Sequence, residues 1–408
     1  MLRTRRLHGY RPLFSIVLIM FLWTVGSGVL WFLLPCIIEG FFSDVRVVGL
    51  VIALPNIIAL LVDLPAGDMV DKVGRKRSLV FAFAMLMLLG LGFMYISSGL
   101  HAVMFLVGLG LVYQIVYISA LAQVMDVSPR RDYSKFLGVE MSFIHLGFSL
   151  GPILAGVVIS LFGFSMIATV SVTYALFCLL ALLATMKLLK KEDNRLTFVE
   201  SVKSVVLKDK LVIKELLNFG KLRGTGLVIL FLTFIFTFFD GAVWLIQPLY
   251  YTKFSANPLY GGIIMAAFVI PLVLFEVPAG ALADKIGRRN VLFVGLMTAG
   301  AFSILFSYST SLITLVLTAF MATCGLAMAW PSSEGIISEK SSSSDRGGLI
   351  GVWSLAYDLG YVVGPLTAGL IAAYAGEKNV FVVLGGVVIL SALMTLTIKE
   401  DKPHKPRL

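Results

Sequence analysis

Long apolar runs alternate with short polar segments along nearly the whole chain. A helix needs about 20 mostly apolar residues to cross the hydrocarbon core of a bilayer, and each run has roughly that length. The short alternating segments that are typical of transmembrane strands are absent from the sequence. The pattern therefore predicts an all-α polytopic membrane protein with twelve spanning helices, over residues 13–38, 47–70, 79–97, 102–123, 136–162, 165–189, 224–250, 261–283, 290–308, 311–334, 348–373 and 380–398.

The composition supports this class of protein. Hydrophobic residues make up 59% of the 408 residues, charged residues 14%, and the mean hydropathy is +0.96. Because about a quarter of the residues in a soluble domain are charged, a soluble protein is excluded. The three cysteines are scattered in apolar runs and form no CxxC pair, so we expect them to be packing residues.

Lysine and arginine are distributed unevenly over the segments between the runs. Of the 33 basic residues, 30 lie in one alternating set of segments, and only Arg46, Lys253 and Lys378 lie in the other set. Cytoplasmic segments carry the excess of basic residues, so we expect a multi-pass protein of the cell membrane with both termini in the cytoplasm. The first apolar run is expected to be retained as a helix rather than cleaved as a signal peptide. The net charge of +10 then needs no nucleic acid as a partner.

The longest segment between runs, residues 190–223, is rich in charge. Its apolar residues recur near helical spacing, with lysines on the other faces. Two interpretations fit this pattern, a basic amphipathic helix on the inner membrane surface and a solvated linker.

The chain contains an internal repeat with an offset of 213 residues. The phrase DLPAGDMVDKVGRKR begins at Asp63, and EVPAGALADKIGRRN begins at Glu276. The phrase GFSLGPILAG at 147–156 likewise corresponds to GYVVGPLTAG at 360–369. We therefore expect two six-helix halves of the same orientation, residues 1–189 and 224–408, joined by the segment 190–223. Parallel repeats of this kind place a substrate site between the halves near the midplane.

The repeated phrase resembles the cytoplasmic signature of the major facilitator superfamily, which lies between helices 2 and 3. The resemblance extends over essentially the whole chain and implies that family's fold of two six-helix bundles. It also implies that the signature residues latch the halves together on the cytoplasmic side in the outward-facing state. The alternative is that the charges are only topological anchors. These gate residues are Gly67, Asp71, Gly74, Arg75 and Lys76 in the first copy, and Gly280, Asp284, Gly287, Arg288 and Arg289 in the second. The glycines are expected to allow close helix approach and unusual backbone angles.

The glycine-proline pattern of helix 5 resembles one found in drug–proton antiporters. Small residues let helices approach closely, and proline bends a helix, so we expect a sliding contact between the halves. The residues of this packing interface are Gly147, Gly151, Pro152 and Gly156, with Gly360, Gly364, Pro365 and Gly369 in helix 11. Antiporters of this type usually carry an arginine in helix 4, whereas this chain has Met104 near that position.

Ionisable residues inside the apolar runs are candidates for function because they are costly to insert, by roughly 2.5–3.5 kcal/mol each. Asp240 lies deep in helix 7, and we expect it to bind a proton or a cationic group of the substrate. His145 and Asp358 occupy equivalent positions in helices 5 and 11 and are further candidates for coupling. For all three, a hydrogen bond to neighbouring backbone or helices is the structural alternative.

The family's fold implies that helices 1, 4, 7 and 10 line the central cavity. The polar and aromatic residues expected there are Thr24, Ser27, Trp31, Tyr113, Gln114, Tyr117, Thr237, Trp244, Gln247, Trp330 and Glu334. Aromatic faces with few acids suit flat, lipophilic cations through cation–π contacts. Packing alone is the alternative for each ring.

Several functional classes are disfavoured. The sequence contains no phosphate-binding loop, no metal-ligand cluster and no serine-nucleophile elbow, so we expect neither an enzyme nor a bound metal or cofactor. The favoured function is a monomeric secondary transporter that exports lipophilic or cationic small molecules in exchange for protons. The alternatives are uptake of a polar nutrient such as a sugar or organic acid, and a non-transporting membrane receptor on the same fold.

Overall fold

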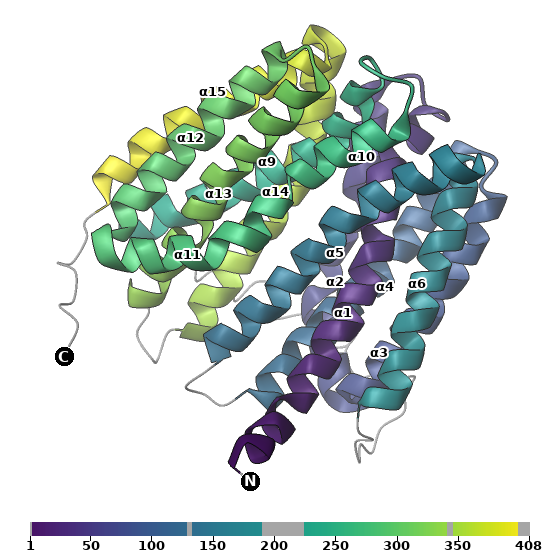
Figure 1. Ribbon diagram of the computed structural model, residues 1–408, viewed down its shortest axis with the longest axis vertical. Helices are drawn as coiled ribbons and strands as arrows, with labels where there is room; N and C mark the ends of the chain where they lie inside the picture. The colour runs from purple at the N-terminus through teal and green to yellow at the C-terminus, as the bar shows by residue number, and fades with distance from the viewer. Residues whose placement is uncertain (1, 129–132, 190–223, 341–345, 399–408) are drawn as a thin grey trace. The chain divides into compact units, whose positions relative to one another are not determined.

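Helices make up nearly all of the protein that the structure describes. The computed structural model describes residues 2–128, 133–189, 224–340 and 346–398 (Figure 1). Within these ranges the helices are α1 (Leu2–Glu39), α2 (Val45–Val73), α3 (Arg75–Gly92), η1 (Phe93–Tyr95), α4 (Gly99–Val127), α5 (Tyr133–Phe162), α6 (Met166–Leu188), α9 (Thr225–Tyr251), α10 (Pro258–Ala267), α11 (Ile270–Ile286), α12 (Arg288–Tyr308), α13 (Leu312–Lys340), α14 (Arg346–Ala375), α15 (Glu377–Met394) and η2 (Thr395–Thr397). Twelve helical spans are long and apolar enough to cross a membrane, which confirms the predicted fold class.

The eighth predicted span differs from the structure. The sequence pattern predicts one helix over 261–283, but the span divides into α10 and α11 at Phe268 and Val269. Pro271 has no N–H group with which to continue the helical ladder. On either side of it the amides of Val269 and Leu272 bond only three residues back, to the carbonyls of Ala266 and Val269, at 3.0 Å each. A proline near the middle of the span therefore interrupts its helix.

The chain divides into two compact units that differ slightly from the predicted halves. The first unit comprises residues 1–41 and 54–211, and the second comprises residues 42–53 and 212–408. The short segment 42–53, which begins the second span of the first predicted half, thus groups with the second unit. The predicted amphipathic helix of 190–223 lies outside the described residues.

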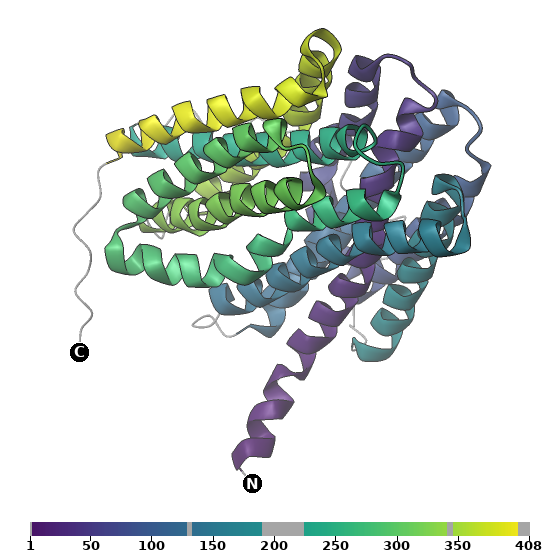
Figure 2. The same cartoon turned by 45° about the horizontal axis from the view of Figure 1, so that its top comes forward.

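The internal repeat recurs in the packing of each unit. In the first unit α1 packs along α5, and in the second unit α9 packs along α14 (Figures 1 and 2). A Cβ atom added to Gly147 would lie 2.1 Å from Oγ1 of Thr24, and one added to Gly360 would lie 1.9 Å from Oγ1 of Thr237. Each unit therefore uses the same threonine–glycine contact, at positions 213 residues apart.

The other predicted interface glycines also pack mainly inside one unit. A Cβ atom on Gly151 would lie 2.6 Å from Cα of Gly28 in α1, and one on Gly364 would lie 2.4 Å from the carbonyl oxygen of Phe238 in α9. The sliding contact between the halves stays a prediction. These two glycines set the close packing of α5 on α1 and of α14 on α9.

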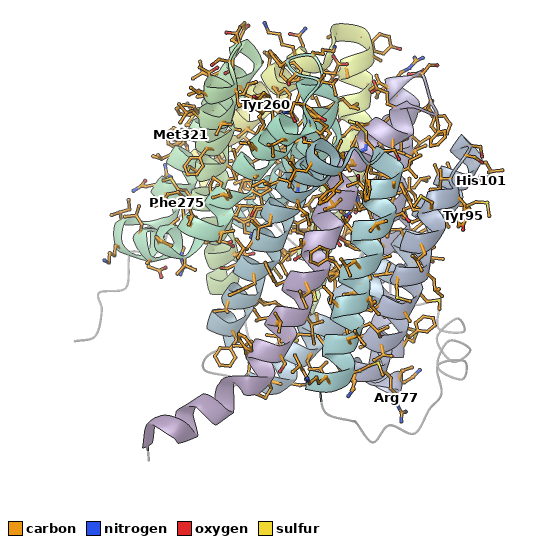
Figure 3. All side chains as sticks on the ribbon, turned by 45° about the vertical axis from the view of Figure 1, so that its right-hand side comes forward. Arg77, Tyr95, His101, Tyr260, Phe275 and Met321 are labelled. Atoms are coloured by element: carbon orange, nitrogen blue, oxygen red, sulfur yellow. The ribbon has the colours of Figure 1, made fainter. Side chains whose placement is uncertain are left out.

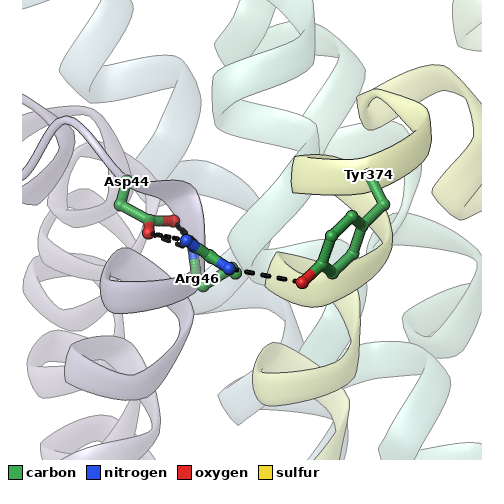
Figure 4. A network of polar contacts seen from close by, with 3 residues as sticks. All are labelled: Asp44, Arg46 and Tyr374. Atoms are coloured by element: carbon green, nitrogen blue, oxygen red, sulfur yellow. Dashed lines mark hydrogen bonds and ion pairs between the residues drawn. The ribbon is translucent and has the colours of Figure 1, made fainter.

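Segment 42–53 packs on α14 within the second unit. A Cβ atom on Gly369 would lie 2.8 Å from the carbonyl oxygen of Val45 and 3.4 Å from Cα of Gly49. Nearby, the Arg46 guanidinium forms an ion pair with Asp44 at 2.6 Å and donates to the Tyr374 hydroxyl at 3.3 Å (Figure 4). The hydrogen bonds from Arg46 hold the pKa of the Asp44 carboxyl below its usual value. A glycine contact and a small polar network thus join the start of α2 to the end of α14.

Large apolar side chains also lie on the exposed surface. Phe275 and Met321 are examples, and Tyr95 is 81% exposed at the end of η1 (Figure 3). Apolar side chains on the outside of spanning helices are the expected neighbours of lipid tails.

Candidate substrate-binding site

Asp240 is the ionisable residue deepest in α9, and two neighbouring side chains hold its carboxylate. The hydroxyl of Tyr361 in α14 donates a hydrogen bond of 2.7 Å to Oδ2 of Asp240. Trp244, one helical turn further along α9, also hydrogen-bonds the carboxylate. The Asp240 side chain keeps part of its surface accessible. Among the described residues it forms no ion pair.

A row of aromatic rings extends from Asp240 along α14. The rings of Tyr361 and Tyr357 have centroids 5.2 Å apart, and those of Tyr357 and Trp353 are 5.5 Å apart. Trp330 of α13 meets Tyr357 edge to face at 5.7 Å. All four rings keep part of their surface accessible, so a ligand could reach them. Ring faces beside a carboxylate favour binding of organic cations.

A second carboxylate stands at the far end of this row. Oε1 of Glu334 accepts a hydrogen bond of 2.9 Å from Nε1 of Trp330, one turn earlier on α13. Glu334 is exposed, and no described basic residue pairs with it. Glu276 of α11 lies within electrostatic range of Glu334. The wall formed by α9, α13 and α14 is therefore acidic and aromatic.

The first unit contains an aromatic cluster that has no acid. Nε1 of Trp31 in α1 donates to the Tyr113 hydroxyl of α4 at 3.2 Å. Tyr113 lies 5.4 Å from the ring of Tyr117, and Trp23 contacts both tyrosines at 4.5 and 5.1 Å. The predicted residues Trp31, Tyr113 and Tyr117 therefore meet in space. Ser27, which is fully buried, occupies the position equivalent to Asp240.

The repeat relates the two aromatic clusters. Trp23 and Tyr117 correspond, at the offset of 213, to Phe236 and Trp330. Trp23 contacts Tyr117 edge to face at 5.1 Å, and Phe236 stacks on Trp330 at 6.0 Å. Equivalent residues therefore make a ring contact in both units, but among the described residues only the second cluster has hydrogen-bonded carboxylates, those of Asp240 and Glu334.

Like Ser27, three other predicted cavity residues do not face open space. Thr24 and Thr237 are fully buried, and their hydroxyls donate to carbonyls of their own helices, such as Met20 at 2.9 Å and Thr233 at 3.2 Å. Threonine in a helix commonly bonds back in this way. Gln247 is also fully buried, and its Nε2 donates to the carbonyl oxygen of Gly261 at 3.2 Å. These three side chains serve helix packing in this structure.

For the remaining predicted residues the structure gives a place on a helix and no contact with Asp240. His145 is half-buried on α5 in the first unit, and Gln114 is half-buried on α4. Asp358 is half-buried on α14, within electrostatic range of Tyr357. Coupling roles for His145 and Asp358 stay predictions.

The sequence reasoning missed three rings of α14. Trp353, Tyr357 and Tyr361 recur every four residues, a spacing that puts them on one helix face. The spacing can be read from the sequence, but comparison of the two halves did not point to it. The equivalent positions in helix 5 hold other residues, among them Ile144 and Phe148. Trp23 was missed because it directly precedes Thr24, outside the face assigned to the cavity.

The first signature copy ties four helices of the first unit together, α2, α3, α4 and α6. Arg75 forms ion pairs with Asp71 of α2 at 2.9 Å and with Asp126 of α4 at 3.0 Å. Lys76 donates to the carbonyl oxygen of Met186 at 2.8 Å, at the end of α6. A basic group is favourable at a helix C-terminus.

The second copy repeats these contacts within the second unit. Arg288 pairs with Asp284 at 2.9 Å, and Arg289 donates to the carbonyl oxygen of Ile398 at 3.5 Å, directly after η2. Gly74 and Gly287, which are the whole turn between paired helices, have φ of 97° and 99°. The latch between halves therefore stays a prediction, because the recorded contacts of both copies are internal to a unit.

One expectation about the signature is wrong. Gly67 was expected to allow a close helix approach, but a Cβ atom added there would meet nothing within 4 Å. Gly67 lies inside α2, which continues to Val73, so it is not part of the turn, its φ is not positive, and the space beside it is open in the described part of the chain.

Twelve spans, an internal repeat and an accessible wall of acids and rings define a membrane transporter rather than an enzyme. The chain belongs to the Major Facilitator Superfamily, whose family model matches residues 16–239 and 229–408. The resemblance of the signature motif is thereby confirmed.

Relatives within the family have varied substrates. The 4-hydroxybenzoate transporter PcaK of Acinetobacter baylyi is 25% identical over 187 residues, which are 45% of this chain and 41% of PcaK. The quinolone resistance protein NorA of Staphylococcus aureus is 24% identical over 161 residues, 40% of this chain and 41% of NorA. Each match thus spans less than half of the relative. The crystal structure of a D-xylose–proton symporter matches 94% of this chain and 97% of its own, with a TM-score of 0.71 at 18% identity, which shows the fold.

Proposed function

We propose that this transporter moves lipophilic or aromatic cations, and that Asp240 receives the positive charge. The observation that carries the proposal is the Asp240 carboxylate, which lies within a span beside the rings of Tyr361 and Tyr357 and has no basic partner among the described residues. A carboxylate in that position needs a compensating charge, because an isolated ion is costly to bury. A bound cation or a proton supplies it.

The distribution of basic residues supports a cation over an anion. Every lysine and arginine of the twelve spans lies within three residues of a span end. By contrast, Asp240 and Glu276 lie deep inside their spans. The field inside the spans is therefore negative, which favours positively charged ligands.

Exchange for protons follows from the same carboxylate. If Asp240 binds either a proton or the substrate cation, each displaces the other, and alternating access then couples the two flows. The direction we propose is export across the cell membrane, with both termini in the cytoplasm and the monomer as the working unit. NorA, named as a quinolone resistance protein, supports export, whereas PcaK favours the alternative of uptake of an aromatic acid.

The test is uptake of ethidium, a flat monocation, into energised inside-out vesicles. We expect uptake by the wild type that a protonophore abolishes and that Asp240→Asn lowers at least tenfold. A wild type that accumulates 4-hydroxybenzoate and no ethidium would support the uptake alternative. A wild type that moves no small molecule in any such screen would support a receptor.

A further inference from the structure

The wall formed by α9, α13 and α14 carries two carboxylates, which we call its negative poles. Asp240 lies at one end of the ring row, held by Tyr361, and Glu334 lies at the other end, held by Trp330. The rings of Trp330, Tyr357 and Tyr361 connect them in two centroid steps of 5.7 and 5.2 Å. Each carboxylate receives hydrogen bonds from neighbouring aromatic side chains, and neither is neutralised by a described basic residue.

A basic group close to the second carboxylate does not neutralise it. The Arg288 guanidinium lies over Gly335, next in the chain to Glu334. Its recorded ion pair, however, is with Asp284 at 2.9 Å. Glu276 adds a further acid within electrostatic range of Glu334, so this end of the row is the more acidic one.

The geometry points to a two-pole site for elongated dications, in which a flat aromatic core lies along the ring row and one cationic centre sits at each carboxylate. This inference rests on the proposed function, since it refines the substrate class of the same site. The aromatic rings contact the flat core of the ligand and bind its charge through cation–π interactions. The Glu334 carboxylate discriminates between singly and doubly charged substrates, because only a dication has a second charge to place there. A monocation needs Asp240 and the rings only, whereas a dication needs Glu334 as well.

Ethidium and propidium make a matched pair of probes, because both have the same planar core and propidium carries a second, quaternary cationic centre on a side chain. We expect the wild type to transport both dyes in energised inside-out vesicles. Glu334→Gln should lower propidium transport at least tenfold and leave ethidium transport within about twofold. Asp240→Asn should lower both. Glu377→Gln is the matched control, because Glu377 pairs with Lys253 away from the row, and it should change neither dye.

The possible results distinguish failure of the two-pole site from failure of the proposed cation transport. Failure of the wild type to move either dye overturns the proposed function. Transport of ethidium without propidium by the wild type overturns the two-pole site alone. The same holds if Glu334→Gln lowers both dyes equally or neither dye. Retained ethidium transport shows in the same vesicles that the variant is folded and inserted.

Discussion

The hydroxyl of Tyr361 donates a hydrogen bond of 2.7 Å to Oδ2 of Asp240 and links α14 to α9. The same two helices are also packed through Gly360, which directly precedes Tyr361, and Thr237, which lies about one turn before Asp240. The position of the carboxylate is therefore set by the closest helix pair of the second unit. Small changes in this pair should alter substrate binding more than changes elsewhere in the bundle.

Tyr361→Phe should weaken cation binding without unfolding the protein. The substitution removes one hydrogen bond to a charged group, which contributes about 1.5–3 kcal/mol, and keeps the ring. We expect the KM for ethidium to rise about tenfold or more while the melting temperature changes little. Tyr374→Phe is a control that removes a tyrosine hydroxyl at the far end of α14, and it should leave this KM unchanged. An unaltered KM in Tyr361→Phe would show that the hydrogen bond does not position Asp240.

Gly360→Ala should destabilise the second unit. The added methyl group would lie 1.9 Å from Oγ1 of Thr237 and 2.7 Å from the carbonyl oxygen of Phe234, and the backbone oxygen cannot turn away. Overpacking of this kind costs about 1–3 kcal/mol. The melting temperature of the purified transporter should therefore fall. Gly386→Ala is the matched control, because a methyl group there meets nothing within 4 Å, and it should be neutral or slightly stabilising. Equal melting temperatures for the two variants would contradict the packing account.

Arg75→Ala should destabilise the first unit more than Arg77→Ala. The Arg75 side chain is 22% exposed and bridges the carboxylates of Asp71 and Asp126, so its loss leaves two acids without their partner. We expect a loss of about 1 kcal/mol, at the upper end for partly exposed ion pairs. Arg77 is exposed at the same turn and serves as the control (Figure 3). Thermal unfolding followed by thiol labelling of the buried Cys178 measures the difference. If the two variants unfold together, Arg75 is only a topological anchor.

The Asp44–Arg46–Tyr374 network should respond to acid. The pKa of Asp44 is lowered by the hydrogen bonds from Arg46, so the stabilisation is present above the usual pKa of aspartate and is lost as the pH falls through the lowered value. Amide exchange in residues 42–53 should therefore stay slow from neutral to mildly acidic pH. Arg46→Ala should speed that exchange at neutral and mildly acidic pH, where Asp44 is ionised, and Tyr374→Phe should do so less, because it removes only the bond of 3.3 Å. Identical exchange in Arg46→Ala and the wild type would mean that Gly49 and Gly369 hold the contact alone.

The sequence predicted the fold well because its signals are strong and local. Apolar length predicts each span, and the repeat of 213 residues predicts equivalent contacts, such as Arg75–Asp71 and Arg288–Asp284. Pro271 interrupts the eighth span at Phe268 and Val269, a break that a hydropathy pattern does not reveal.

The candidate site was less predictable because it depends on which side of a helix faces which neighbour. Asp240 and Trp330 were predicted from charge and aromatic character. Thr237 lies on the same helix as Asp240, and Thr24 holds the equivalent position on α1. Both look equally polar in sequence, yet they face glycines of α14 and α5. Tyr361 was missed because only the packing of α14 on α9 brings its hydroxyl to Asp240.

The central claim is that the Asp240 carboxylate couples cation movement to protons. The most direct measurement is ethidium uptake into energised inside-out vesicles by the wild type and by Asp240→Asn, each with and without a protonophore, with Asp240→Glu retaining the acid. The account predicts uptake in the wild type that the protonophore abolishes, near-complete loss in Asp240→Asn and partial recovery in Asp240→Glu. Full protonophore-sensitive uptake by Asp240→Asn would contradict it.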